Sequence, residues 1–105
     1  EKMNAEPIIL LDDDKSRGAG TYTLKESLSN FRKINIIACA TTLGANTTSF
    51  EVPVCAFKNL PTDSPGFLFT ILGSNQFIYV QYVNDTTITI DSHSASFLRT
   101  IYGIK

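Results

Sequence analysis

Apolar residues along this chain recur in short runs that alternate with polar positions, and this pattern predicts β-strands almost throughout. The expected strands cover residues 8–11, 21–24, 34–40, 50–57, 67–72, 77–83, 86–90 and 97–105. Turn-forming residues separate them at intervals of about 8–12 residues, and crossover helices are missing, which is typical of antiparallel sheets. We therefore expect an all-β fold, an antiparallel β-sandwich of roughly seven to eight strands.

Two segments modify this pattern. Leu28 and Phe31 lie three positions apart, so both can face the interior of a single helical turn, and Ser27 before them is able to cap it. Pro53, within the run 50–57, cannot donate a hydrogen bond to a neighbouring strand. It predicts either a free sheet edge or a bulge at that position.

Composition and charge narrow the classes of partner. The 105 residues, 43% of them hydrophobic, suffice for one domain with a single core. The formal net charge of -1 argues against nucleic acid, because phosphate binding needs clustered basic charge. No apolar run approaches the ~20 residues of a membrane-spanning helix, so we expect no membrane insertion. Residues 1–7 are interpreted as a linker from an upstream shaft or domain, and residues 8–105 as the sandwich.

The chain contains only two cysteines, Cys39 and Cys55. Small secreted domains stapled by disulfides usually carry four or more. Symmetric pairing of the two strands around the turn at residues 44–46 puts Cys39 opposite about Val52, roughly three residues from Cys55. At ~3.3 Å per residue this offset exceeds the ~7 Å that a disulfide allows between Cα atoms. We expect two reduced, half-buried thiols, in keeping with a reducing cytosol.

Patterns for catalysis or metal binding are sparse. His93 is the only histidine, which excludes a metal site built from two or three imidazoles. It lies beside Asp91 and Ser92 in an expected loop, but catalytic triads are assembled from distant segments, so we interpret this loop as a solvated turn. The acidic run at residues 12–14 lacks the alternating ligands and distal Glu of a calcium loop. We expect no enzymatic activity, no cofactor and no metal.

The strand at residues 77–83 places aromatic side chains on its outer face. Gln81 is polar and shares one side of this strand with Phe77 and Tyr79, so that side is expected to face outward. The residues expected to face inward are Ile78, Val80 and Tyr82. An exposed strip of aromatic and polar side chains suits either a sugar-binding platform or a subunit interface.

Two separate parts of the chain together resemble a known family. Residues 20–31 read GTYTLKESLSNF and lead into the strand that starts near Lys33, and the chain closes with IYGIK at residues 101–105. This order resembles the small C-terminal β domains of bacteriophage tail fibre and tail-spike proteins. The resemblance covers residues 20–105, and its motifs are structural, since none of them identifies a ligand residue.

The resemblance implies a homotrimeric domain at the fibre tip of a virion, made in the cytoplasm of the bacterial host. It implies binding to host cell-surface polysaccharide or lipopolysaccharide. The alternative is a purely structural trimerisation or capping domain of a fibre or depolymerase, with no ligand of its own. Sugars are held by aromatic faces and short polar side chains. The candidate ligand-binding residues are Tyr79, Gln81, Asn46, Thr47, Thr48, Asp91 and His93.

Overall fold

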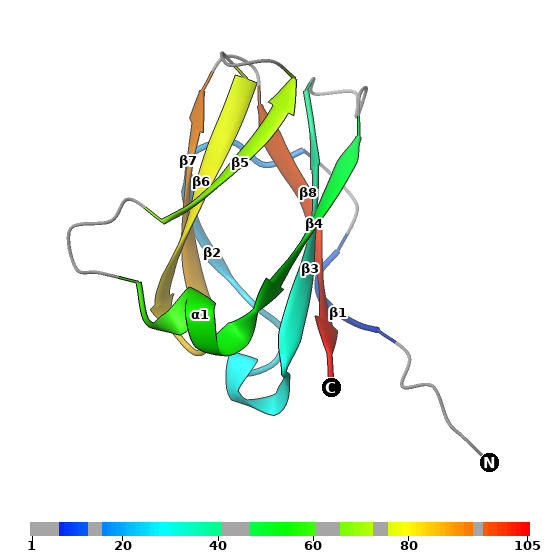
Figure 1. Ribbon diagram of the computed structural model, residues 1–105, viewed down its shortest axis with the longest axis vertical. Coiled ribbons are helices and arrows are strands. Elements are labelled where there is room, and N and C mark those ends of the chain that lie inside the picture. Colours follow the sequence, from blue (N-terminus) through cyan, green and yellow to red (C-terminus); the bar gives the residue numbers. More distant parts are fainter. Residues whose placement is uncertain (1–6, 13–15, 41–46, 61–65, 73–75, 94–95) are drawn as a thin grey trace.

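The computed structural model of the chain describes residues 7–12, 16–40, 47–60, 66–72, 76–93 and 96–105. The strands in these ranges form two four-stranded sheets packed face to face (Figure 1). The first sheet has the order β1 (Ile8–Leu11), β8 (Phe97–Ile104), β3 (Lys33–Cys39) and β4 (Thr48–Pro53). The second has the order β2 (Gly20–Thr23), β7 (Thr87–His93), β6 (Gln76–Asn84) and β5 (Phe67–Leu72). All these neighbouring strands pair antiparallel, so the expected sandwich is confirmed.

The hydrophobic core lies between the inner faces of the two sheets. Successive side chains of a strand point to opposite sides, so alternate positions supply the core. Its fully buried aliphatic side chains include Ile34 and Ile36 of β3, Ile78 and Val80 of β6, Ile88 of β7, and Leu98 and Ile101 of β8. Burying each such side chain contributes about 1.5–3 kcal/mol. The predicted inner face of β6 is confirmed, with Tyr82 half-buried against the core.

The predicted helical turn is also present, as the 3-10 helix η1 (Leu28–Asn30). The hydroxyl of Ser27 accepts a hydrogen bond from the backbone N–H of Ser29 at 3.2 Å, which is the predicted cap. Leu28 is fully buried, and its N–H donates to the carbonyl of Asp85 at 2.7 Å. This bond ties η1 to the connection between β6 and β7.

The strand predicted over residues 50–57 ends at Pro53, and a short helix, α1 (Val54–Lys58), follows it. Within α1 the side chains of Val54 and Phe57 are buried, whereas that of Ala56 is exposed, so the spacing is helical. The alternation of Val54 and Ala56 fits a strand equally well, which is why the pattern alone gave the wrong element here. β4 itself is an edge strand, which is the first of the two alternatives that Pro53 predicted.

Helix α1 closes the lower end of the sandwich in the view of Figure 1. It contacts β3 and β4 of the first sheet and β6 of the second. The buried ring of Phe57 lies between the sheets, 6.1 Å from the ring of Phe67 and 6.0 Å from that of Tyr82, measured between centroids. These aromatic contacts fix α1 across the gap between the two sheets.

Strand β7 is longer than predicted. Asp91, Ser92 and His93 were expected in a solvated turn, but they pair with β6, with Tyr79 opposite Asp91 and Phe77 opposite His93. Asp has low strand propensity. The long β6 strand supplies backbone partners as far as residue 93, and this pairing outweighs the local preference.

Both cysteines are free thiols, as expected, but neither is half-buried. Cys39 is buried in β3, and Cys55 is exposed on α1. The symmetric count of the hairpin is wrong, because Val52 pairs with Ile34 rather than with Cys39. The true register places the two thiols at opposite ends of the β3–β4 pair.

Candidate functional site

The outward face of the second sheet carries Phe77, Tyr79 and Gln81, as the sequence predicted, together with Leu68 of β5 and Asp91 of β7. We call Leu68, Phe77, Tyr79, Gln81 and Asp91 the outer-face strip. Tyr79 on β6 lies directly opposite Leu68 on β5 and Asp91 on β7, so these three side chains share one face. The rings of Phe77 and Tyr79 meet edge to face, with centroids 5.7 Å apart.

The strip combines apolar and hydrogen-bonding groups on adjacent strands. Leu68 is 53% exposed, which is high for a large apolar side chain, whereas the two aromatic rings are half-buried. The hydroxyl of Thr89 lies 3.4 Å from the side-chain oxygen of Gln81, to which it donates a hydrogen bond across β6 and β7. The strip thus offers ring surface, an amide and a carboxylate within one sheet face.

The structure brings together some of the predicted site residues and separates others. Tyr79, Gln81 and Asp91 share the outer-face strip, and the backbone position of His93 lies opposite Phe77 at one end of it. Thr47 and Thr48 lie at the start of β4, an edge strand of the other sheet. Asn46 lies outside the described residues. The predicted set is therefore divided between two sheets.

A second feature, which the sequence analysis missed, is an open pocket at the end of the sandwich that α1 closes. The pocket has a volume of about 690 Å³ and lies between η1, the start of β3 and α1; we call it the end pocket. Its lining includes the basic Arg32, Lys33 and Lys58 and the polar Ser29 and Asn59. Arg32 and Lys33 are adjacent in sequence, but only the β3–β4 pairing and the helix after it bring Lys58 to the same place.

Backbone hydrogen bonds hold the walls of the end pocket. The N–H of Val54, the first residue of α1, donates to the carbonyl of Arg32 at 2.8 Å. The N–H of Arg32 donates to the carbonyl of Ile104 at 3.0 Å, and Lys33 pairs with Pro53 in the sheet register. The pocket is therefore built into the ends of β3, β4 and β8 rather than onto a separate loop.

The cations of the end pocket are oriented by acceptors. Lys33 forms an ion pair with Glu51 at 3.3 Å, and Lys58 forms one with Asp85 at 3.0 Å. The guanidinium of Arg32 donates to the main-chain oxygen of Lys105 at 3.2 Å. Each basic side chain is held in a defined direction by one of these partners.

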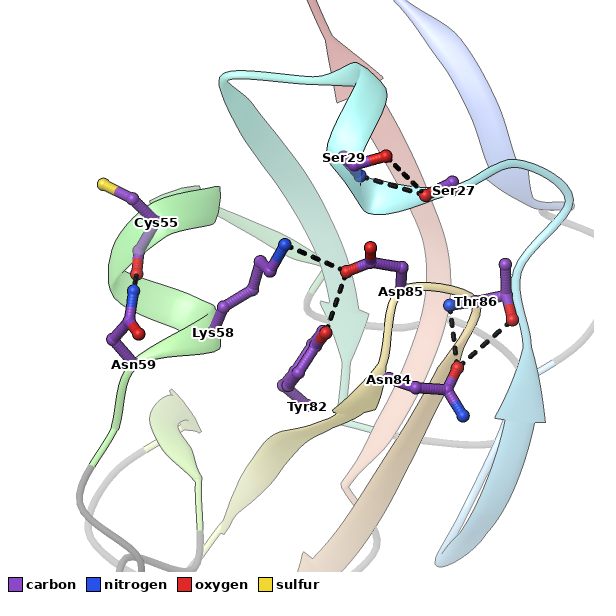
Figure 2. Close-up of polar contacts among 9 residues, drawn as sticks. All are labelled: Ser27, Ser29, Cys55, Lys58, Asn59, Tyr82, Asn84, Asp85 and Thr86. Atoms are coloured by element: carbon purple, nitrogen blue, oxygen red, sulfur yellow. Dashed lines mark hydrogen bonds and ion pairs between the residues drawn. The ribbon is translucent and has the colours of Figure 1, made fainter.

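Tyr82, Asp85 and Lys58 form one polar cluster between α1 and the β6–β7 connection. Figure 2 shows Lys58 reaching from α1 to the same carboxylate oxygen that accepts the Tyr82 hydroxyl at 2.8 Å. The hydrogen bond from Tyr82 and then that from Lys58 lower the pKa of the Asp85 carboxyl. The hydrogen bond to Asp85 raises the pKa of Lys58, so this ammonium is charged throughout the neutral range.

Among the residues that the structure describes, no group of three or more His, Cys, Asp and Glu side chains is placed to hold a metal ion. No helix within the described ranges is long and apolar enough to cross a membrane. Of the acidic run at residues 12–14 only Asp12 is described, and it pairs with Lys25 at 2.8 Å.

Comparisons of the chain with models of known families, with curated proteins and with solved structures found no match. The class of the protein is therefore defined by its own fold, an antiparallel β-sandwich with an aromatic–polar outer face and a basic pocket at one end.

Proposed function

We propose that this chain is the C-terminal domain of a bacteriophage tail fibre or tail spike, which binds host cell-surface carbohydrate and supports assembly of a homotrimeric fibre. The outer-face strip is the observation that carries this proposal. Exposed apolar patches rimmed by polar side chains often mark sites of protein interaction or ligand binding. The resemblance of residues 20–105 to fibre-tip domains supports the same function.

The strip has the chemistry that sugar recognition requires. A sugar ring presents C–H groups that stack on aromatic faces, and hydroxyls that need both donors and acceptors. Tyr79 supplies the ring, Gln81 an amide, and Asp91 a carboxylate on the adjacent strand. These three side chains therefore carry the ligand-binding part of the proposal, with His93 at the end of the same strand.

Assembly uses the apolar part of the same face. Leu68 and Val83 are 53% and 49% exposed, and both lie on the outer side of the second sheet. Interfaces between subunits are enriched in aromatic and apolar side chains at their centres. Around a three-fold axis the strips of two protomers can face each other, so a sugar site can be shared between chains. A purely structural trimerisation domain is the alternative, and the apolar Leu68 favours it.

The test combines light scattering with a glycan array of bacterial surface polysaccharides. We expect the wild-type chain to have the mass of a trimer at micromolar concentration and to bind a subset of the array. Tyr79→Ala should abolish array binding while keeping the trimer. Tyr102→Ala, which removes a half-buried tyrosine from the outer face of the other sheet, is the matched control and should retain both properties.

The results distinguish carbohydrate binding from a purely structural role in trimer assembly. If Tyr79→Ala loses the trimer and binding together, the strip is an interface and the structural alternative stands. If wild-type chain is a stable monomer and binds nothing on the array, both parts of the proposal fail.

A further inference from the structure

We infer that the end pocket is a second binding site, which takes a small ligand that carries an oxyanion, either a carboxylate or a phosphate. The inference goes beyond the proposed function and does not depend on it. The end pocket lies among η1, the start of β3 and α1, and it shares no residue with the outer-face strip.

Charge is the first argument for an anionic ligand. Arg32, Lys33 and Lys58 all line the pocket, and its lining contains no carboxylate. Glu51 and Asp85 pair with the two lysines from outside this lining. Arg32 donates to the main-chain oxygen of Lys105, and no acidic side chain among the described residues pairs with it. Because Glu51 and Asp85 offset the two lysines, the local excess of positive charge comes from Arg32.

Positive charge also adjoins the pocket from the C-terminal side. The ammonium of Lys105 lies 6.0 Å from the centroid of the Phe31 ring, and Phe31 is one of the residues that line the pocket. An oxyanion near Arg32 would therefore have a further cation close by. A planar guanidinium can hold a carboxylate or a phosphate through two parallel hydrogen bonds, which is the strongest form of such a contact.

The second argument is that two of the cations already have a partner that orients them. The ammonium of Lys58 is held by Asp85, and the guanidinium of Arg32 by the main-chain oxygen of Lys105. An ammonium has three donor hydrogens and a guanidinium five, so one partner does not exhaust either group. A ligand that binds here orders few additional side-chain torsions, and this lowers the entropic cost of binding.

The volume of the end pocket and its uncharged lining residues indicate what kind of ligand it can hold. A volume of about 690 Å³ falls in the range of about 300–1,000 Å³ that small-molecule sites occupy. Phe31, Pro53 and Val54 add apolar surface, while Ser29 and Asn59 add polar groups. A lining of this kind suits a ligand with a C–H face, hydroxyls and one charged group. An acidic sugar residue, whether a uronate or a sugar phosphate, has all three.

Nuclear magnetic resonance titration of the full 15N-labelled chain tests the inference. The probes are glucuronate, inorganic phosphate and neutral glucose, all at millimolar concentration and constant ionic strength. We expect glucuronate or phosphate to shift the amide signals of Ser29, Arg32 and Val54, and glucose to leave them in place. Comparison of glucuronate with phosphate shows which oxyanion the pocket prefers.

Substitutions assign the shifts to the pocket. Arg32→Gln and Lys58→Gln should each weaken binding of the preferred anion about tenfold, the usual effect of losing a charge-assisted hydrogen bond. Lys25→Gln removes an exposed lysine that does not line the pocket, and it should leave binding unchanged. Thermal unfolding of each variant is measured alongside, and Arg32→Gln alone suffices if Lys58→Gln does not fold.

The outcomes that overturn the inference are equally definite. It fails if neither anion shifts these amides, or if glucose shifts them as much. It also fails if Lys25→Gln weakens binding as much as Arg32→Gln does. Tyr79→Ala, which tests the outer-face strip, should leave the shifts intact, so failure of one site is distinguishable from failure of the other.

Discussion

The aromatic ring of Phe31 occupies the space that a side chain at position 103 would need. A Cβ atom built on Gly103 would lie 2.6 Å from the nearest ring carbon of Phe31. Phe31 directly follows η1, and Gly103 lies near the end of β8. The contact therefore joins the two segments that carry the resemblance to fibre domains, because one contains Phe31 and the other contains Gly103. The small residue at position 103 is explained by packing rather than by ligand binding.

We expect Gly103→Ala to lower the free energy of unfolding by about 1–3 kcal/mol, because the new methyl group would overlap the Phe31 ring and force it to shift. Urea denaturation measures the change. Gly18→Ala is the control, since its Cβ would lie 3.8 Å from the nearest atom, at ordinary contact distance. It should change stability by no more than about 0.5 kcal/mol.

The same substitution in a Phe31→Leu background tests the cause. Leucine is smaller than the ring, so the cost of Gly103→Ala should fall when both changes are present. An equal loss in the two backgrounds would show that the Phe31 ring is not what excludes a side chain at position 103.

The free energy of unfolding should depend on pH through the titration of the Tyr82–Asp85–Lys58 cluster. The pKa of Asp85 is lowered from 3.8 in the folded chain, so its contribution is present above that value and is lost as the pH falls through the folded pKa. The pKa values of Tyr82 and Lys58 are raised from 10.0 and 10.5. Their contributions are therefore present below those values and are lost as the pH rises through the folded pKa values.

Tyr82→Phe tests the part of this dependence at low pH, which comes from the hydrogen bond between Tyr82 and Asp85. The stability difference between wild type and Tyr82→Phe should be nearly constant between about pH 5 and pH 8 and should shrink below about pH 4. The effect is small, because these groups are partly exposed to water. Tyr22→Phe is the control, since the Tyr22 hydroxyl donates to the carbonyl of Gly18 at 2.9 Å and no such change at low pH is expected. A difference that grows toward pH 3 would contradict the assignment.

The sequence predicts the β6 part of the outer-face strip because successive side chains of a strand point to opposite faces. Leu68 and Asp91 join it only through the pairing with β5 and β7. One polar position, Gln81, was enough to orient Phe77 and Tyr79 outward. Helix α1 was missed because Val54 and Ala56 alternate like strand residues, and only the distant partners of Phe57 decide between the two structures. The local hydrophobic pattern shows which face of a strand is buried. Whether a short segment forms a strand or a helix depends also on the distant residues that bury it.

The end pocket could not be predicted for a related reason. Its position depends on the register of β3 against β4, in which Ile34 pairs with Val52. Symmetric counting around the intervening turn gave another register. That register does not bring Lys58 close to Arg32. A pocket assembled from two strand ends and a short helix therefore depends on a pairing that the hydrophobic pattern leaves open.

The two thiols should differ in reactivity. Cys55 is exposed on α1 and Cys39 is buried in β3, so Ellman's reagent should titrate one thiol rapidly in the folded chain and the second only in denaturant. Cys55→Ser should abolish the rapid reaction and leave the single thiol that reacts only in denaturant. Two rapid equivalents, or no thiol even in denaturant, would contradict the burial of Cys39 or the reduced state of the pair.

Leu68 allows assembly to be separated from folding. Its side chain is 53% exposed, so Leu68→Thr removes little buried surface, and threonine is well suited to a strand. We expect the free energy of unfolding of the monomeric fold to change by no more than about 0.5 kcal/mol. If the second sheet forms the contact between copies, the same change should move the equilibrium from trimer to monomer at a given concentration. Light scattering over a dilution series measures this shift.

Ile9→Thr is the matched control for this experiment. Ile9 is 44% exposed and lies on β1, an edge strand of the other sheet, so it offers a comparable apolar group away from the outer-face strip. We expect this variant to dissociate at the same concentration as the wild type, and Val83→Thr to behave like Leu68→Thr. If Ile9→Thr dissociates more readily than Leu68→Thr, the copies meet through the first sheet. The outer-face strip would then be exposed in the assembly and open to a ligand along its whole length.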